Sequence, residues 1–363
     1  MKVGILTFHR AENFGAIMQV YALQTYLKGL GLNVEIIDYR CFMIESHYEI
    51  FSPLILFSRK NIFKTFVEYV QRFGNIKDRI TRKKKFHLFL NKFLCLSKSI
   101  YKWNKPLDYD CIMVGSDQVW NTHLIKGDED VFFLNKPFLN KTLRVAYAAS
   151  SEKNGLDKEH LYKLGQLVDQ FYKVSVRESF LKDELSKYTL KEIGVCLDPT
   201  FLLNGNDYLK IAVKPCVDRY VLIYHMTKIS DEMISFIENI AIKKNLKIIE
   251  VYGSFEVHND ERHIVSWGPL DILGYIAYAD LVFTTSFHGL AFSVIFNKNF
   301  WVVNKGDNLR QKNILSSLGL STRLLNDIHE YNDSDIDYGL VRSHLDSMIG
   351  FSKNFLSFLK KSE

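Results

Sequence analysis

The sequence predicts an α/β fold with two Rossmann-like domains. Its 363 residues are more than one hydrophobic core of ordinary size would hold. Short apolar runs that favour strands alternate with segments of helical periodicity, which is the pattern of β-α-β units around a parallel sheet. The pattern restarts between residues 204 and 215. We therefore expect a first domain over 1–205 and a second over 206–363 that ends in a C-terminal helix.

The first unit consists of a buried strand over 3–8, a helix over about 17–30 and a second strand over 34–38. The loop after the first strand carries Asn13 and Gly15, and it lacks the three glycines of a dinucleotide-binding fingerprint. Gly15 would let the backbone approach a ligand, and Asn13 could hydrogen-bond that ligand. A tight turn with polar residues on the surface explains both residues equally well.

Further strands of the first domain end in polar residues. Open parallel sheets bind ligands at the carboxyl ends of their strands, so we expect a binding site at that edge. A loop with a carboxylate and an indole, Asp117 to Asn121, follows one of these strands. The expected strands lie over 109–114, 142–149, 173–176 and 194–197, and the polar residues that would gather are Asn13, Asp117, Ser150, Arg177 and Asp198.

A basic insertion over about 58–105 differs from the rest of the chain. It contains fourteen Lys and Arg residues against Glu68 and Asp78, a net charge of about +12, which leaves about −6 for the remainder. Aromatic and aliphatic residues interleave with this charge at helical spacing, so the segment predicts basic amphipathic helices. Two interpretations stay open. The segment is a solvated face packed on the first domain, or it contacts an anionic membrane or glycan, whereas no nucleic-acid-binding motif accompanies it.

The second domain repeats the alternation of strands and helices. A helix that follows Arg310 and a last amphipathic helix over about 339–359 complete it. We expect strands over 220–224, 246–252, 281–283 and 300–303, and helices over 230–244 and 271–278.

The stretch over 281–300 carries the most chemical information. An apolar strand leads into three hydroxyl residues that end at Ser286, and His288 and Gly289 precede an apolar run that predicts a buried helix. A helix that begins near Gly289 would direct free N–H groups and its positive dipole end at a ligand. His288 can carry a proton near neutral pH. Alternatively, His288 only caps the helix.

Composition restricts the class of protein. Apolar residues make up 47% of the chain and charged residues 24%, as is typical of a soluble globular protein. The first apolar run is too short for a signal peptide, and no run approaches the length of a membrane span. The five cysteines show no C-x-x-C pair, which favours reduced thiols, a cytoplasmic location and no structural zinc.

Several motifs together resemble the polysaccharide pyruvyl transferase family. They follow the family's order between residue 3 and about 320, and six motifs in order are far more specific than one. The matching residues are Phe8-His9-Arg10 with Asn13-Phe14-Gly15-Ala16 and Gln19 with Tyr21-Ala22-Leu23-Gln24; Val114-Gly115-Ser116-Asp117-Gln118-Val119-Trp120-Asn121; Ala146-Tyr147-Ala148-Ala149-Ser150; Ser175-Val176-Arg177-Glu178; Leu197-Asp198-Pro199-Thr200; and Thr285-Ser286-Phe287-His288-Gly289.

The resemblance implies a GT-B-like fold, in which two Rossmann-like domains face each other across a cleft. It also implies transfer of a pyruvyl group from phosphoenolpyruvate to hydroxyls of a sugar, forming a ketal, with no metal and no further cofactor. His288 matches the family's catalytic histidine and can protonate the enol carbon of the donor. Asp117 can take a proton from the incoming hydroxyl.

The two substrates are expected at different residues. Arginines and helix N–H groups suit the phosphate and carboxylate of the donor. The acceptor is expected to be a glycan or lipid-linked sugar, modified in the cytoplasm and, if the basic insertion binds lipid, at the inner face of the membrane. The candidate donor-binding residues are Arg177, Arg310, Ser286, Gly289, Asn13 and Gly15, and the candidate acceptor-binding residues are Trp120, Asn121 and Ser150.

One departure from the family pattern leaves the donor open. Many family members carry Arg-x-His where this chain has Ser286-Phe287-His288. Ser286 cannot replace the charge of that arginine. Either another arginine compensates or the donor is not phosphoenolpyruvate. The alternatives are a GT-B glycosyltransferase that uses a nucleotide sugar and a non-catalytic glycan-binding relative.

Overall fold

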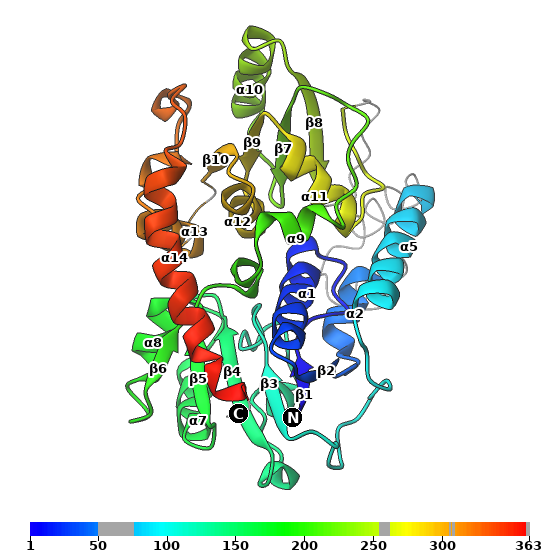
Figure 1. Cartoon of the computed structure of the whole chain (residues 1–363), viewed down its shortest axis with the longest axis vertical. Helices are drawn as coiled ribbons and strands as arrows, with labels where there is room; N and C mark the ends of the chain where they lie inside the picture. Colours follow the sequence, from blue (N-terminus) through cyan, green and yellow to red (C-terminus); the bar gives the residue numbers. More distant parts are fainter. Residues whose placement is uncertain (50–75, 254–261, 305, 307–308, 361–363) are drawn as a thin grey trace, which may run out of the picture.

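The computed structural model describes residues 1–49, 76–253, 262–304, 306 and 309–360. Two parallel sheets lie one above the other along the long axis of the molecule (Figure 1). Part of the predicted basic insertion, 58–75, lies outside the described residues.

The first sheet has six strands in the order β2-β1-β3-β4-β5-β6, and every neighbouring pair is parallel. Its central strands are almost entirely buried because helices cover both faces of a parallel sheet. The strands are β1 (Lys2–Leu6), β2 (Asn33–Ile36), β3 (Cys111–Val114), β4 (Leu143–Ala149), β5 (Lys173–Val176) and β6 (Ile193–Val195), and the helices are α1 (Phe14–Gly29), α2 (Phe42–Tyr48), α5 (Ile76–Phe93), α6 (Glu129–Phe132), α7 (Lys158–Val168) and α8 (Ser179–Leu185).

The second sheet has five parallel strands in the order β11-β10-β9-β7-β8. A link with the short helix α9 (Gly205–Leu209) leads into it. Its strands are β7 (Tyr220–His225), β8 (Lys247–Tyr252), β9 (Leu281–Thr284), β10 (Asn299–Val303) and β11 (Leu324–Leu325), and its helices are α10 (Asp231–Lys243), α11 (Pro269–Tyr278), α12 (Phe287–Ile295), α13 (Leu309–Ser317) and α14 (Tyr338–Phe355).

The halves are held together by aromatic packing and by the C-terminal helix. Phe14 of α1 contacts Phe292 of α12, with ring centroids 5.1 Å apart. Helix α14, red in Figure 1, runs from the second sheet back to the first. There Ser352 Oγ accepts a hydrogen bond from the backbone N–H of Leu197 at 3.0 Å. The predicted fold class, two Rossmann-like halves in a GT-B-like arrangement, is confirmed, while a boundary between residues 205 and 206 stays a prediction.

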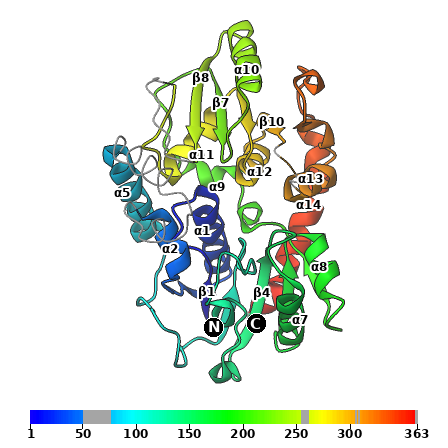
Figure 2. The same ribbon diagram turned by 180° about the vertical axis from the view of Figure 1, so that it is seen from behind.

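Helix α5 joins the two halves through part of its basic run. Figures 1 and 2 show it at the side of the molecule, beside α2. The guanidinium of Arg82 is buried 3.5 Å from the ring centroid of Trp267 and donates to the backbone oxygens of Glu12 and Gly253, each at 3.3 Å. Lys85 Nζ donates to Asp271 Oδ2 of α11 at 2.8 Å. These residues of the run therefore form contacts within the protein and do not constitute a free basic surface.

Contact of the basic insertion with a membrane stays a prediction. No helix in the described part of the chain combines the length and the apolar character needed to cross a membrane.

Candidate functional site

A cavity of about 720 Å³ lies where strand ends of the two halves meet. Its size is that of a small-molecule site, and its wall combines apolar and polar side chains. Among the described lining residues, Arg310 and Lys153 carry fixed positive charge, and Asp117 and Glu152 carry negative charge. The predicted site residues that line it are Asn13, Asp117, Ser286, His288 and Arg310.

His288 lies on the first turn of α12 and is 12% exposed in its side chain. The helix begins at Phe287, two residues earlier than expected, because Ser286 is its N-cap: the Oγ accepts a hydrogen bond from the Gly289 N–H at 3.3 Å. The alternative that His288 caps the helix is therefore wrong. The His288 ring therefore does not serve as the helix cap.

Gly15 lies directly against this ring. A Cβ added to Gly15 would fall 1.8 Å from His288 Nδ1, a distance that no side chain tolerates. Asn13 Oδ1 caps α1 and accepts from the backbone N–H groups of Gly15 and Ala16, at 2.9 and 3.2 Å. The sequence predicted that Gly15 allows a ligand to approach, whereas in the structure it allows the ring of His288 to approach. The positive ends of α1 and α12 thus both lie at the cavity wall.

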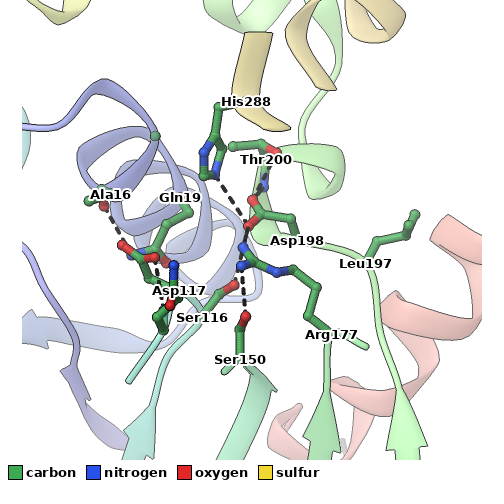
Figure 3. Close-up of polar contacts among 12 residues, drawn as sticks. Ala16, Gln19, Ser116, Asp117, Ser150, Arg177, Leu197, Asp198, Thr200 and His288 are labelled. Carbon is green, nitrogen blue, oxygen red and sulfur yellow. Dashed lines mark hydrogen bonds and ion pairs between the residues drawn. The ribbon is translucent and has the colours of Figure 1, made fainter. Parts of the chain in front are cut away.

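Asp198 is the carboxylate that faces His288. Its Oδ2 lies 3.4 Å from His288 Nε2 and accepts from Arg177 Nη1 at 2.7 Å and Ser116 Oγ at 3.2 Å (Figure 3). The backbone N–H and the Oγ of Thr200 donate to Oδ1 at 3.0 and 2.9 Å. Burial raises the pKa of Asp198, but His288 and Arg177 lower it further, so the net pKa is well below its usual range. The carboxylate is therefore ionised at neutral pH.

Sequence reasoning placed Asp198 at the sheet edge but gave it no function. The available signal was its position at the end of a predicted strand, in the Leu197-Asp198-Pro199-Thr200 motif. That signal says nothing about a histidine 90 positions later in the chain.

Arg177 is buried, and its nitrogen atoms face acceptors within the protein. Nε donates to Glu178 Oε1 at 3.1 Å, and Nη2 donates to Ser150 Oγ at 2.8 Å, in addition to the bond to Asp198. The Ser150 hydroxyl donates in turn to Glu178 Oε1 at 2.7 Å. Neither Arg177 nor Ser150 belongs to the described lining of the cavity. The geometry assigns both residues to the support behind the cavity wall.

Arg310 has the opposite environment. It lies on the first turn of α13 and faces the cavity, where its Nη2 is 3.8 Å from Glu152 Oε1. Burial, followed by the nearby Arg177, lowers the pKa of Arg310, although a guanidinium stays protonated at any physiological pH. Arg310 is thus the arginine in the described cavity wall that is available to bind an anion.

The loop after β3 divides into a cavity part and a core part. Asp117 lines the cavity with φ of 78°, a left-handed conformation that costs a non-glycine residue free energy and is often found at functional sites. Trp120 is fully buried, and its Nε1 donates to the carbonyl of Phe132 at 3.2 Å. The Asn121 amide donates to Gln118 Oε1 at 2.7 Å. The structure therefore does not bring Trp120 and Asn121 to the described cavity wall.

Gly289, a predicted donor-binding residue, does not belong to the described lining of the cavity, whereas helix α2 does. Gly289 is buried against Thr284, since a Cβ there would lie 2.2 Å from Thr284 Oγ1, and its N–H is bonded to Ser286. Helix α2, which sequence reasoning did not predict, lines the cavity through Met43, His47 and Tyr48. A helix of only seven residues leaves too short a pattern to be recognised in the sequence.

No group of three or more His, Cys, Asp or Glu residues in the described part of the chain is arranged to hold a metal ion. The expected lack of a metal stays a prediction.

Comparison with known proteins gives one family and a set of distant structures. The family model described as polysaccharide pyruvyl transferase matches residues 13–308. No curated protein matches the chain. The chain is 11% identical to the UDP-GlcNAc 2-epimerase of Neisseria meningitidis bound to UDP-GlcNAc, with a TM-score of 0.49 over 100% of this chain and 95% of that one.

Two further solved structures are similar at the same level. For the UDP-GlcNAc 2-epimerase of Methanocaldococcus jannaschii the identity is 10% and the TM-score 0.47, over 96% of this chain and 93% of that one. For a spinosyn rhamnosyltransferase the identity is 9% and the TM-score 0.46, over 100% of both chains. Similarity this low says nothing about what the chain binds.

Proposed function

The chain belongs to the polysaccharide pyruvyl transferase family and is therefore a transferase, and we propose that it moves a pyruvyl group from phosphoenolpyruvate to two hydroxyls of one sugar. The product is a ketal on a surface polysaccharide or its precursor, made in the cytoplasm. One observation carries the proposal: the position of His288 at the cavity wall, beside the buried carboxylate of Asp198.

His288 acts as the general acid. Its protonated ring transfers a proton to the CH₂ carbon of the donor, and a cation-like centre forms at the carbon that carries the phosphate. The ionised Asp198 supports the positive ring before the transfer. The nearby positive ends of α1 and α12 favour the anionic donor over a neutral ligand.

Arg310 binds an anionic group of the donor. Its guanidinium lies in the cavity wall, and its nearest acidic partner, Glu152, is at 3.8 Å, so it can turn to a phosphate or carboxylate. Arg177 is less suited to this function because its donors already face Asp198, Glu178 and Ser150. Arg310 thus compensates for the serine at position 286.

The acceptor sugar reacts in two steps. Its first hydroxyl attacks the cationic carbon and loses a proton, which Asp117 in the cavity wall accepts. The second hydroxyl then displaces the phosphate at the same carbon, so that a ketal and inorganic phosphate leave the enzyme. One C–H bond and two C–O bonds form, while the C=C π bond of the donor, its C–O bond to phosphate and the two sugar O–H bonds break. The proton of the second hydroxyl leaves with the phosphate.

Calorimetry with phosphoenolpyruvate tests the donor. We expect Arg310→Ala to weaken binding by about ten- to a hundredfold, which is the range of a charge-assisted hydrogen bond. Arg342→Ala is the control. Arg342 is an exposed arginine of α14 whose Nη2 donates a hydrogen bond to Asn297, so its removal should leave phosphoenolpyruvate binding unchanged. If the wild-type protein binds a nucleotide sugar but no phosphoenolpyruvate at millimolar concentration, the pyruvyl transfer fails and a glycosyltransferase replaces it.

A further inference from the structure

The catalytic histidine is held across the junction between the two halves. Asp198 follows β6 of the first sheet, and His288 follows β9 of the second. Their closest atoms, Oδ2 and Nε2, are 3.4 Å apart. A distance of this kind is longer than a charged hydrogen bond, and such bonds in ligand-free sites often shorten when substrate binds.

The two ring nitrogens of His288 have different environments. Nε2 is buried and has Asp198 as its nearby acceptor. Nδ1 lies on the side of Gly15, where an added Cβ would come within 1.8 Å of it. Nε2 is closed off on the side of Asp198. Nδ1 is therefore the ring nitrogen that is not directed at the carboxylate, and the ring that carries it lines the cavity.

Asp198 is itself fixed in orientation. Its side chain is fully buried, and it accepts from Arg177, Ser116 and Thr200 with both oxygens. These donors prevent the carboxylate from rotating away from the ring. Among the other charged groups here, Glu178 lies behind Arg177, while Asp117 and Arg310 face the cavity.

We propose that Asp198 is a positioning residue that keeps a proton on Nε2 of His288, so that Nδ1 is the nitrogen that delivers the catalytic proton. The inference rests on the proposed function of His288 as the acid. The inference specifies which ring nitrogen donates the proton. It also implies that the histidine is correctly positioned only when the two halves are in contact, because Asp198 and His288 belong to different halves. After the transfer, the ring is neutral, with its remaining proton on Nε2 directed at Asp198.

The tautomer of His288 can be measured without any substrate. Protein labelled with ¹⁵N-histidine shows separate Nδ1 and Nε2 shifts for each of the 11 histidines, and the signals missing from His288→Gln identify those of His288. We expect the neutral ring of the wild-type protein to carry its proton on Nε2. A neutral ring with its proton on Nδ1 would overturn the inference, independently of which substrate the enzyme uses.

Asp198→Asn supplies the kinetic test. We expect kcat to fall by ~10²-fold with the KM for phosphoenolpyruvate changed less than threefold, because the acid is misplaced while the donor site stays. The alkaline limb of the pH profile of kcat/KM should move to lower pH, since the charge that supports the imidazolium is lost. Asp198→Glu, which keeps the charge, should restore part of kcat.

Asp157→Asn is the matched control. Asp157 also contacts a histidine, with Oδ1 2.9 Å from His160 Nδ1, but the pair is on the surface at the start of α7. It should leave kcat and the pH profile unchanged. Loss of kcat in Asp198→Asn without a shift of the pH profile contradicts the positioning role. Absence of phosphoenolpyruvate turnover in the wild-type protein contradicts the proposed function instead.

Discussion

His9 and His288 each lie beside a buried aspartate that an arginine also contacts, yet only His288 faces the cavity. His9 Nε2 is 2.9 Å from Asp38 Oδ1, and His9 Nδ1 is 3.1 Å from the carbonyl oxygen of Thr7. Arg10 donates to both oxygens of Asp38, at 2.8 and 2.7 Å. Both ring nitrogens of His9 are therefore engaged within the protein.

The difference lies in how many ring nitrogens have a partner within the protein. Buried polar groups require partners, and His9 has a partner for each nitrogen, as expected of a residue that fixes a loop. His288 has an acidic partner for Nε2, and no hydrogen bond within the described residues engages Nδ1. Similar residue types therefore differ in their surroundings: both ring nitrogens of His9 have partners within the protein, while the ring of His288 lines the cavity. Under the proposed function, the first cluster serves stability and the second serves chemistry.

Replacing each histidine by glutamine tests this difference most strongly. We expect His288→Gln to lower turnover by ~10²-fold or more, because the acid is lost, with little change in melting temperature. His9→Gln should do the opposite, lowering the melting temperature while the folded fraction keeps its specific activity. Phosphate release and thermal melts measure the two effects. A strong loss of stability with full specific activity in His288→Gln would make His288 structural as well.

The contact between Gly15 and the His288 ring provides the second test. Gly15→Ala places a methyl group where Nδ1 lies, so the ring must move, and we expect turnover to fall on the order of 10²-fold. Gly29→Ala is the control at the other end of the same helix, because a Cβ there meets no atom within 4 Å. It should leave turnover unchanged and stabilise the fold slightly. Equal activity of both variants would show that the ring position is not critical.

The acid dependence of stability tests the His9 cluster. Burial raises the pKa of Asp38, but hydrogen bonds from His9 and Arg10 lower it further, so that the net pKa lies well below its usual value. Because the folded-state pKa is depressed, its stabilisation is fully present above pH of about 4 and is lost as the pH falls through the folded pKa. We expect Asp38→Asn to cost about 2 kcal/mol at neutral pH.

Urea unfolding at neutral pH and below pH 4 measures this effect. The difference in unfolding free energy between wild type and Asp38→Asn should shrink as the pH falls. A constant difference across that range would show that the charge of Asp38 does not contribute.

Ser286 gives the smallest expected effect. Ser286→Ala removes the N-cap of α12 and should lower the unfolding free energy by about 1 kcal/mol. Ser286→Arg should lower stability similarly, but its guanidinium restores the common family pattern and should tighten phosphoenolpyruvate binding. Melting curves and calorimetry separate the two. Weaker donor binding in Ser286→Arg would show that position 286 does not face the donor.

Local patterns in the sequence determined the strands other than the two-residue β11, the parallel sheets and the edge at which polar residues collect. Apolar runs and helical periodicity are properties of neighbouring residues, so they can be read without knowing the partners. Asn13 and Asp117 reached the cavity because each follows a strand of the same sheet, whose carboxyl ends share an edge. The cap at Ser286 was not predicted, although serine before an apolar helix is a common start signal.

Only the tertiary structure decided which way the polar side chains turn. Arg177 and Ser150 lie at the expected edge of the sheet, but behind the cavity wall. They hydrogen-bond each other and Glu178, and Arg177 also donates to Asp198. The contacts of Gly15 and Asp198 with His288 join residues from different halves. Such contacts depend on how two separately formed sheets pack, and no local periodicity encodes that packing. For the same reason the sequence marked Arg82 as basic, while the packing of α5 against Trp267 buried it.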